Sequence, residues 1–183
     1  MTLPGYQPTY EDNYLLFYNG SSDYYARVTC TLRQYDSQDY FKQDYQFDTI
    51  RYIPPHSYWA LSTSLTQDVL QYCKILNIIS QVLPTTSATL QYCEFQAVGE
   101  FTVNNVNLLD ANMTGVVENN SAFTPSMVSI QTLFYDQFDA IVAIRNNLLA
   151  SPYPPPMEKK QFTTTVNPVP QFTHTMTTII ATR

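Results

Sequence analysis

The residues best suited to chemistry in this sequence are two histidines and a scatter of cysteines and aspartates. His56 follows two prolines, and His174 lies in a segment rich in threonine. Neither histidine has a metal-ligand spacing to the other or to a cysteine. No motif marks a serine or cysteine as a nucleophile beside them. We therefore expect both histidines to be ordinary strand or loop residues.

Carboxylates are the second possible source of chemistry. Asp136 and Asp139 are three residues apart and could form the acid and base of a glycosidase, but a solvated face is the simpler interpretation. Four further aspartates lie close together in the sequence, as in a calcium-binding loop: Asp36, Asp39, Asp44 and Asp48. They have neither the spacing nor the turn glycine of an EF-hand. Only four glycines are present, which leaves little for a phosphate-binding loop. The sequence predicts no catalysis, no metal and no cofactor.

Most of the polarity of this chain comes from neutral side chains. Thr, Gln, Asn and Ser together supply 60 of the 183 residues, while only 13% of the chain is charged, about half the usual share. An aromatic content of 14% argues against disorder. The net charge is −6 with nine Lys and Arg, and the densest basic cluster is Glu158-Lys159-Lys160. Without clustered cations, direct contact with nucleic acid is not expected.

Tyrosines crowd the first 25 residues among Asp and Asn. Such side chains offer rigid, amphipathic contact area at a low cost in conformational entropy. One interpretation is simple strand packing. The other is a receptor-binding or glycan-binding face made of Tyr14, Tyr18, Tyr24 and Tyr25.

Cysteine usage and the N-terminus bear on the compartment. Cys30, Cys73 and Cys93 form no CxxC motif and are odd in number, which indicates thiols in a reducing compartment, although one bridge between two of them stays open. The first residues have neither the basic start nor the apolar stretch of a signal peptide. No run of about eighteen apolar residues suggests a membrane span.

Two helices are expected from apolar spacing. In residues 64–83, apolar residues recur at helical intervals, Ser64 or Thr66 can cap the start, and Pro84 ends the segment. In residues 125–150, a broad apolar face follows Thr124-Pro125, a cap and a first-turn proline. The remaining alternating segments predict strands.

Strands cluster before the first expected helix, so the fold class expected is α+β with a largely antiparallel sheet. The alternative is a β-sandwich or jelly roll with two helical insertions. We expect an N-terminal arm over 1–12, one globular domain over 13–150, a proline-rich spacer over 151–160, and a threonine-rich C-terminal strand or arm over 161–183.

The C-terminal segment repeats itself, since Gln161-Phe162-Thr163 returns as Gln171-Phe172-Thr173 with prolines between. Such an uncharged, β-prone segment is suited to join a neighbour's sheet as an added strand. We expect its loss to abolish assembly and leave a folded core. The residues expected to carry this assembly arm are Phe162, Thr164, Val166, Phe172, His174, Met176, Ile179 and Ile180.

In composition the whole chain resembles structural proteins of archaeal viruses from hot acidic habitats, which share richness in Tyr, Thr, Asn and Gln and a low charge. The resemblance implies a structural virion component, a coat or minor capsid protein that is not an enzyme. Its partners would be copies of itself and other virion proteins. It would be assembled in the host cytoplasm and reside in the virion, with no direct contact to the genome. A receptor-binding or glycan-binding module is the alternative.

Overall fold

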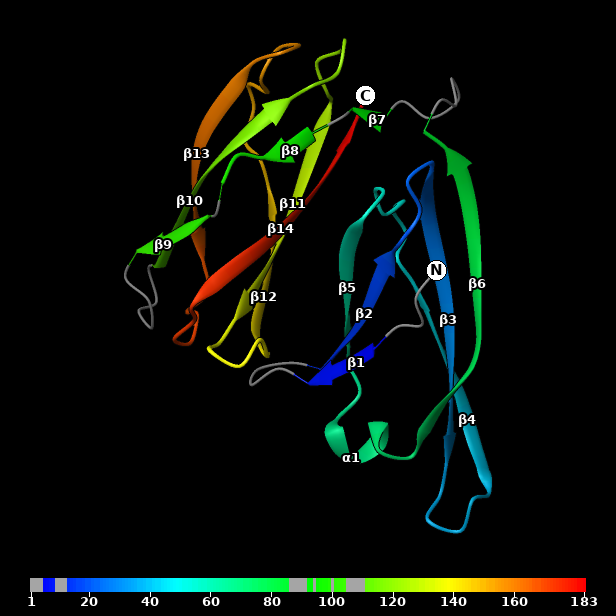
Figure 1. The fold of residues 1–183 in the computed structure, drawn as a ribbon. Helices are drawn as coiled ribbons and strands as arrows, with labels where there is room; N and C mark the ends of the chain where they lie inside the picture. Colours follow the sequence, from blue (N-terminus) through cyan, green and yellow to red (C-terminus); the bar gives the residue numbers. More distant parts are fainter. Residues whose placement is uncertain (1–4, 9–12, 86–91, 94, 100, 105–110) are drawn as a thin grey trace. The chain divides into compact units, whose positions relative to one another are not determined.

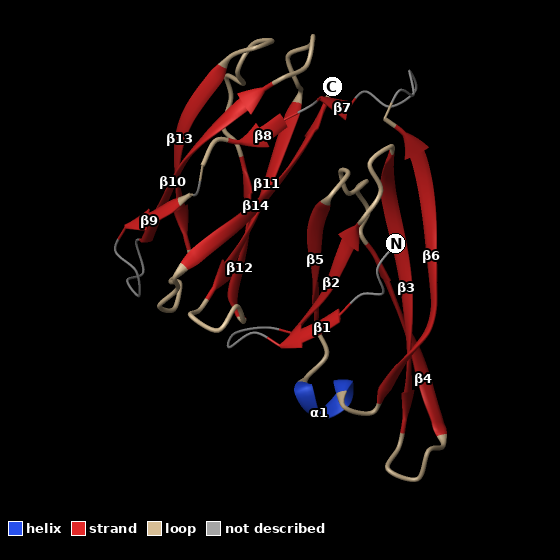
Figure 2. Ribbon diagram, in the orientation of Figure 1, coloured by secondary structure: helices blue, strands red, loops and turns tan. Residues whose placement is uncertain are grey.

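The chain folds into two compact units, seen in a computed structural model that describes residues 5–8, 13–85, 92–93, 95–99, 101–104 and 111–183. Unit 1 comprises Met1–Ser87 and unit 2 comprises Ala88–Arg183. Each unit is built from antiparallel strands in two sheets (Figures 1 and 2). Each is described by itself below.

Unit 1 contains one sheet in the order β1-β2-β5 and another in the order β4-β3-β6. One four-residue helix, α1 (Gln67–Leu70), precedes β6. The strands are β1 (Gly5–Pro8), β2 (Asn13–Asn19), β3 (Tyr24–Tyr35), β4 (Phe41–Asp48), β5 (Ser57–Thr63) and β6 (Cys73–Pro84).

Unit 2 has sheets in the orders β13-β10-β8, with β9 also pairing β10, and β12-β11-β14-β7. Its strands are β7 (Tyr92–Cys93), β8 (Phe95–Ala97), β9 (Thr102–Asn104), β10 (Ala111–Asn119), β11 (Met127–Tyr135), β12 (Ile141–Leu148), β13 (Lys159–Val166) and β14 (His174–Thr182).

The two units repeat one design. In unit 1, β2 pairs with β5, and β3 pairs with β4 and β6. In unit 2, β10 pairs with β13, and β11 pairs with β12 and β14, in the same arrangement. The β3–β4 pair runs from Thr29 opposite Asp48, and the β11–β12 pair from Ser129 opposite Leu148, one hundred residues later. Both pairs carry an irregularity at the same place, before Tyr35 and before Tyr135. The chain is therefore a tandem duplication of one β-sandwich.

Each core lies between the two sheets of its unit. In unit 2, buried side chains from β10 and β13 pack with others from β11, β12 and β14 in one cluster. Phe134 and Met113 are among its fully buried members, and Phe101 meets Phe162 edge-on with ring centroids 5.1 Å apart. In unit 1 every second residue of β3 is buried, from Ala26 to Leu32, as expected for a sheet with one face on a core.

The connections between the sheets are pinned by a buried asparagine in each unit. Asn19 ends β2, and its side-chain Nδ2 lies 2.8 to 3.1 Å from the backbone oxygens of Tyr24, Ile53 and Pro54. These oxygens belong to the first residue of β3 and to the β4–β5 connection, so one side chain ties together the two places where the chain changes sheet. Asn119 does the same in unit 2.

The hairpins β3–β4 and β11–β12 turn in the same way. The Asp36 Oδ1 atom accepts hydrogen bonds from the backbone N–H groups of Gln38 and Tyr40, both at 2.9 Å. One hundred residues later, Asp136 Oδ1 accepts from Phe138 and Ala140 at 2.8 and 3.0 Å. An aspartate that accepts from the backbone in this way stabilises a turn.

The helix expected over 64–83 is wrong, because this segment holds only the short α1 and then the twelve-residue strand β6. The helical spacing was an ambiguous signal, since short apolar runs fit both a helix and a strand. Branched side chains such as Ile75, Ile78 and Ile79 favour the strand.

The helix expected over 125–150 is also wrong, because this segment is the hairpin of β11 and β12. Strand β11 is buried on both faces over seven consecutive residues, so its apolar pattern is continuous and resembles a broad helix face. The Asp136 turn divides the segment. The fold is therefore not α+β with two amphipathic helices but nearly all β, which is closer to the sandwich alternative without its helical insertions.

The expected domain plan also differs from the structure. The boundary between the units falls at Ser87/Ala88, inside the single domain expected over 13–150. The segment 161–183, expected as an arm, contains most of β13 and all of β14, which pair with β10 and β11 of unit 2. Of the N-terminal arm expected over 1–12, the described part forms β1, which pairs with β2.

Candidate assembly surface

Strand β6 is the most exposed apolar element in the described part of the chain. It lies at the edge of the β4-β3-β6 sheet and pairs only with β3 among the described strands. Four of its aliphatic side chains are 45 to 59% exposed: Ile75, Leu76, Ile79 and Val82. Every other edge strand whose burial is described exposes at most one large hydrophobic side chain. We call this strand the β6 edge.

The β6 edge is apolar on both sides of the sheet. Val82 is paired with Ala26 and Ile75 with Leu32, so both point to the side on which β3 buries its core residues. Ile79 is paired with Thr29 and points to the other side. A strand at the end of a sheet, with unpaired backbone groups and apolar side chains on both faces, is a template for another strand.

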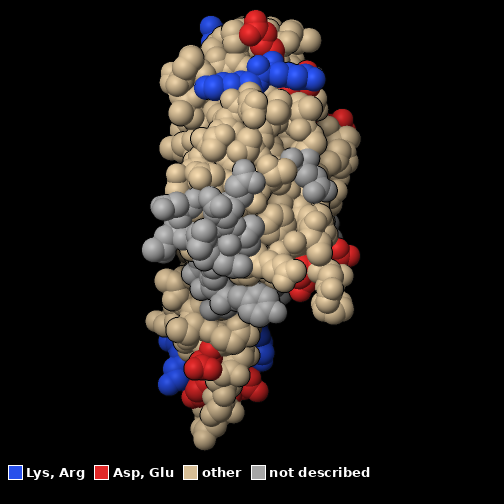
Figure 3. Space-filling view, turned by 90° about the vertical axis from the view of Figure 1, so that its left-hand side faces the viewer, with Lys and Arg blue, Asp and Glu red and all other residues tan. Residues whose placement is uncertain are grey.

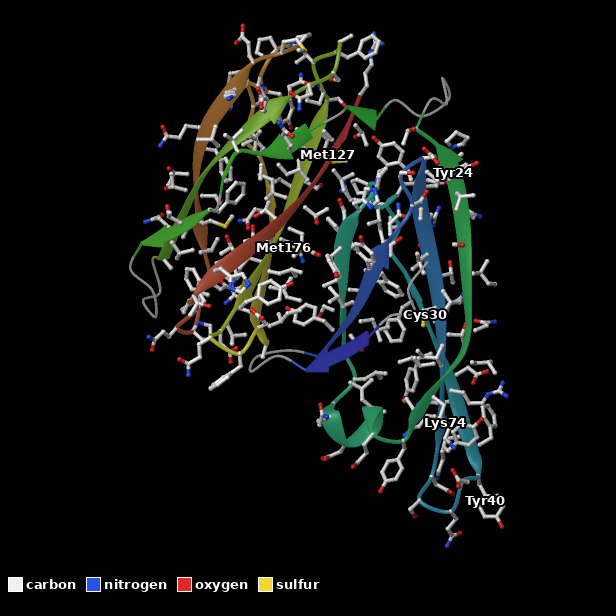
Figure 4. All side chains as sticks on the ribbon, in the orientation of Figure 1. Tyr24, Cys30, Tyr40, Lys74, Met127 and Met176 are labelled. Carbon is white, nitrogen blue, oxygen red and sulfur yellow. The ribbon has the colours of Figure 1, made fainter. Side chains whose placement is uncertain are left out.

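The β6 edge carries one charge, and that charge is matched within unit 1. Lys74 Nζ lies 3.1 Å from Asp39 Oδ1 and 4.7 Å from the centre of the Tyr35 ring. Figure 4 places Lys74 toward the end of the sheet where Tyr40 lies, in the β3–β4 turn. Three other edge strands carry charges, which natural sheets use against pairing: Lys42, Asp44 and Asp48 in β4, the buried Arg145 in β12, and Lys159 and Lys160 in β13, whereas the edge strand β5 has none. Neutral side chains also dominate the face drawn in Figure 3.

Unit 2 closes the corresponding edge. Strand β14 takes the place of β6, and its outer side pairs with β7 through Ala181 opposite Cys93 and Thr182 opposite Tyr92. Strand β8, two residues further on, pairs with β10 of the other sheet. Ile179 and Ala181 of β14 are buried, whereas Ile78 and Ser80, their counterparts in β6, are half-buried and exposed. Among the described strands, this edge is thus covered near the end of β14 by β7 in unit 2, and no strand pairs with it in unit 1.

The residues expected to form an assembly arm are integral parts of unit 2. Phe162, Val166, Ile179 and Ile180 are at most 9% exposed. Phe172 packs on Phe134 with ring centroids 5.0 Å apart. Three others lie on the same two strands with less burial: Thr164, His174 and Met176, of which Met176 is 40% exposed. The structure therefore brings these residues together in one sandwich, where the buried ones are not available to a partner.

The four tyrosines expected to form a ligand face do not share one. Tyr14 is buried at 6% exposure, and Tyr18 packs against Tyr58 with ring centroids 4.6 Å apart. Tyr24 is 42% exposed and adjoins the half-buried Tyr25 on β3. Successive side chains on a strand point to opposite faces, so Tyr24 and Tyr25 are separated by the sheet.

The histidines and aspartates have structural surroundings. The His174 ring stacks on Tyr135 with centroids 4.8 Å apart, and its Nε2 lies 3.7 Å from Asp139 Oδ1. His56 follows the two prolines with a positive φ of 51°. Asp136 and Asp139 belong to the β11–β12 turn. Among the described residues, no group of three or more His, Cys, Asp or Glu is placed to hold a metal ion.

Two cysteines are described as free thiols. Cys30 is buried in β3, in the middle of the strand (Figure 4), and Cys73 begins β6. Burial raises the pKa of both thiols, which makes them poor nucleophiles at neutral pH. The side chain of Cys93 lies outside the described residues, as does any bridge to it.

The duplication was missed in the sequence, although a signal for it is present. The repeated QFT triplet lies twice within unit 2 and so does not mark the duplication. Self-comparison at an offset of one hundred residues finds the true repeat, since eight positions between 19 and 55 are identical: Asn19/Asn119, Ser21/Ser121, Val28/Val128, Tyr35/Tyr135, Asp36/Asp136, Asp39/Asp139, Pro54/Pro154 and Pro55/Pro155.

Comparisons with known proteins provide no functional assignment for this chain. No protein-family model matches this sequence, and no curated protein matches it. Within the described residues, no helix has the length and apolarity needed to cross a membrane.

Proposed function

We propose that this chain is a structural component of a virion, a coat or minor capsid protein that acts by assembly rather than by catalysis. The observation that carries the proposal is the β6 edge of unit 1, an apolar strand whose outer side no other described strand pairs with, whereas the corresponding strand β14 of unit 2 pairs with β7. A soluble monomer normally blunts such an edge with charges, prolines or a covering element. An edge left apolar is suited to a protein that meets partners after folding.

Two further features support a structural role. The sandwich is present twice, and its sheet-to-sheet connections are fixed by a buried asparagine in each unit. The chain is rich in hydroxyl and amide side chains, which do not titrate between mildly acidic and neutral pH. Such a subunit keeps its contacts when the pH of its surroundings changes, as a particle exposed outside a cell requires.

The proposal is tested by the mass of the full-length protein in solution. Light scattering over a range of concentrations, with electron microscopy of the same samples, should show assemblies larger than a dimer. Leu148, 65% exposed on β12 of unit 2, offers a control site, because a lysine there should leave assembly unchanged. A protein that stays monomeric at every concentration would contradict the structural role.

Glycan or receptor binding is a second candidate function, and the exposure of aromatic side chains on unit 1 favours it. Tyr24 is 42% exposed and Tyr40 is 67% exposed, at opposite ends of unit 1 (Figure 4). Each would contact a ligand separately. A glycan array with the wild type, Tyr24→Ala and Tyr40→Ala separates the sites, and binding that survives both changes counts against this candidate.

A further inference from the structure

We infer that the β6 edge pairs with the β6 edge of a second copy of this chain, in antiparallel register about a twofold axis at Ile79. The inference names the partner of the surface on which the proposed structural role rests. The pair would join two β4-β3-β6 sheets into one continuous sheet.

The chain itself shows that this edge of the fold accepts a strand. In unit 2 the outer side of β14 pairs antiparallel with β7, and β14 and β6 hold the same position relative to β11 and β3. Strand addition to an open edge is a common mode of recognition, in which backbone hydrogen bonds provide affinity. The open β6 edge presents the same acceptor over a longer strand, since β6 has 12 residues.

The sequence of β6 is complementary to itself in this register. With Ile79 opposite its own copy, Ser80 lies opposite Ile78, and Val82 lies opposite Ile75 and Leu76, where β6 has an irregularity in its pairing with β3. The amides of Gln81 and Asn77 then face each other. Ile79 with its own copy, Gln81 with Asn77, and Val82 with the apolar Ile75 and Leu76 are matched, and such cross-strand pairs stabilise a sheet.

The charges on β6 do not oppose pairing between two copies of this strand. The one charged residue of β6, Lys74, lies near the end of the strand and falls opposite an uncharged residue of the other copy. Its ammonium group is paired with Asp39 of its own unit. Two copies therefore meet without like charges opposite each other, which would oppose pairing. A strand from a different protein would not need β6 to be able to pair with its own sequence. We therefore name a second copy of this chain as the partner.

The test uses opposite charges at the symmetry axis. Ile79 is 59% exposed, so Ile79→Lys and Ile79→Glu should fold with unchanged circular dichroism and melting temperature. In each variant, two like charges face each other at the centre of the pair, and the dimer dissociation constant measured by sedimentation should rise about tenfold or more. A mixture of the two variants should recover the dimer, because lysine then faces glutamate. Leu148→Lys, an exposed aliphatic residue on another edge, is the matched control and should dimerise like the wild type.

Recovery in the mixture supports the twofold register, since a strand pairing elsewhere would not bring residue 79 to its own copy. A wild type that sediments only as a monomer overturns the inference. Loss of the dimer in both single variants without recovery in the mixture overturns it as well. Assemblies that form regardless of the charge at position 79 overturn this inference while leaving the structural role standing. A dimer that never grows further supports this inference and contradicts the structural role.

Discussion

Asn19 and Asn119, one hundred residues apart, occupy equivalent corners of two copies of the same sandwich. Each side chain is at most 3% exposed, and each donates to the backbone oxygen of the first proline in a Pro-Pro pair, Pro54 or Pro154. Each Oδ1 also accepts from the backbone N–H two residues later, that of Ser21 or Ser121. The asparagine thereby satisfies backbone groups that the change of sheet leaves without strand partners.

Substituting these asparagines should destabilise one unit at a time. Asn119→Ala leaves the buried oxygens of the two connections unsatisfied, and we expect the free energy of unfolding of unit 2 to fall by about 2–4 kcal/mol. Asn19→Ala should do the same to unit 1. Chemical denaturation monitored by NMR signals assigned to each unit measures the unfolding of the two units separately. Asn120→Ala, at a partly exposed neighbouring position, is the control, and an equal effect there would contradict the assigned role.

The turn aspartates should make equal contributions in both units. Asp36→Ala and Asp136→Ala each remove an acceptor of two backbone N–H groups. We expect each to cost about 1–2 kcal/mol of unfolding free energy in its own unit. Asp36→Asn and Asp136→Asn, which keep an acceptor oxygen, should recover most of the loss. Urea denaturation measures both series, and a large difference between the two alanine variants would argue against equivalent turns.

Gly115 should not tolerate a side chain. It lies on β10, and a Cβ atom there would overlap the ring of Phe101, which is 2% exposed and packs on Phe162. Because the ring is enclosed by the core of unit 2, Gly115→Ala should destabilise that unit by about 1–3 kcal/mol. The thermal unfolding of unit 2 measures this. Gly20→Ala, which adds a Cβ in an exposed turn of unit 1, serves as the comparison and should cost less.

Removing residues 161–183 should unfold unit 2 rather than release an arm. The deletion takes away most of β13 and all of β14, which pair with β10 and β11 and supply Phe162 and Ile179 to the core. Limited proteolysis should then yield a resistant fragment ending near Ser87. A truncated protein in which residues 111–150 stay protected would show that this segment is dispensable, as an arm would be.

Acid should weaken unit 1 through three aspartates. The pKa of Asp36 is lowered by the backbone N–H of Tyr40, that of Asp44 by a hydrogen bond from Arg33, and that of Asp48 by one from Arg27. A folded pKa below the unfolded value, about 3.9, means that the unfolded chain binds protons first. The stabilisation is therefore complete above about pH 4 and is lost as the pH falls through the folded pKa values.

The size of this acid effect is modest, because the groups lie at the surface, where solvent screens the ion pairs. The melting temperature of unit 1 should fall as the pH is lowered below about 4. The double variant Asp44→Asn, Asp48→Asn should have a lower melting temperature at pH 7 and a flatter acid profile. A wild-type melting temperature that rises on acidification would contradict the pairing.

The strands could be predicted where one face is solvated, but not where both faces share one environment. The alternating segment that contains Val28, Cys30 and Leu32 is one of those predicted as strands, and it forms β3, whose inward residues are buried and whose outward residues are less so. Strand β11 is buried on both faces and β6 is exposed on both. Neither gives a period of two, and both were assigned to helices.

The candidate surface could be predicted in kind but not in place. A low charge and β-prone apolar segments predicted pairing through an exposed strand, and the C-terminal segment was expected to provide it. Which strand stays open depends on what covers each edge, and this is decided by long-range pairing such as that of β7 with β14. A search at an offset of one hundred residues would have found the duplication, but not which copy is open.

The short strand β7 has a consequence for how far assembly can proceed. Because it covers the edge on unit 2, each chain presents one apolar edge of this kind among its described residues, and its valence for edge pairing is one. An isologous contact between monovalent subunits closes at two chains, whereas two open edges per chain would allow unlimited ribbons. Edge pairing would then supply a dimeric building block, and growth into a shell would have to use a chemically different surface.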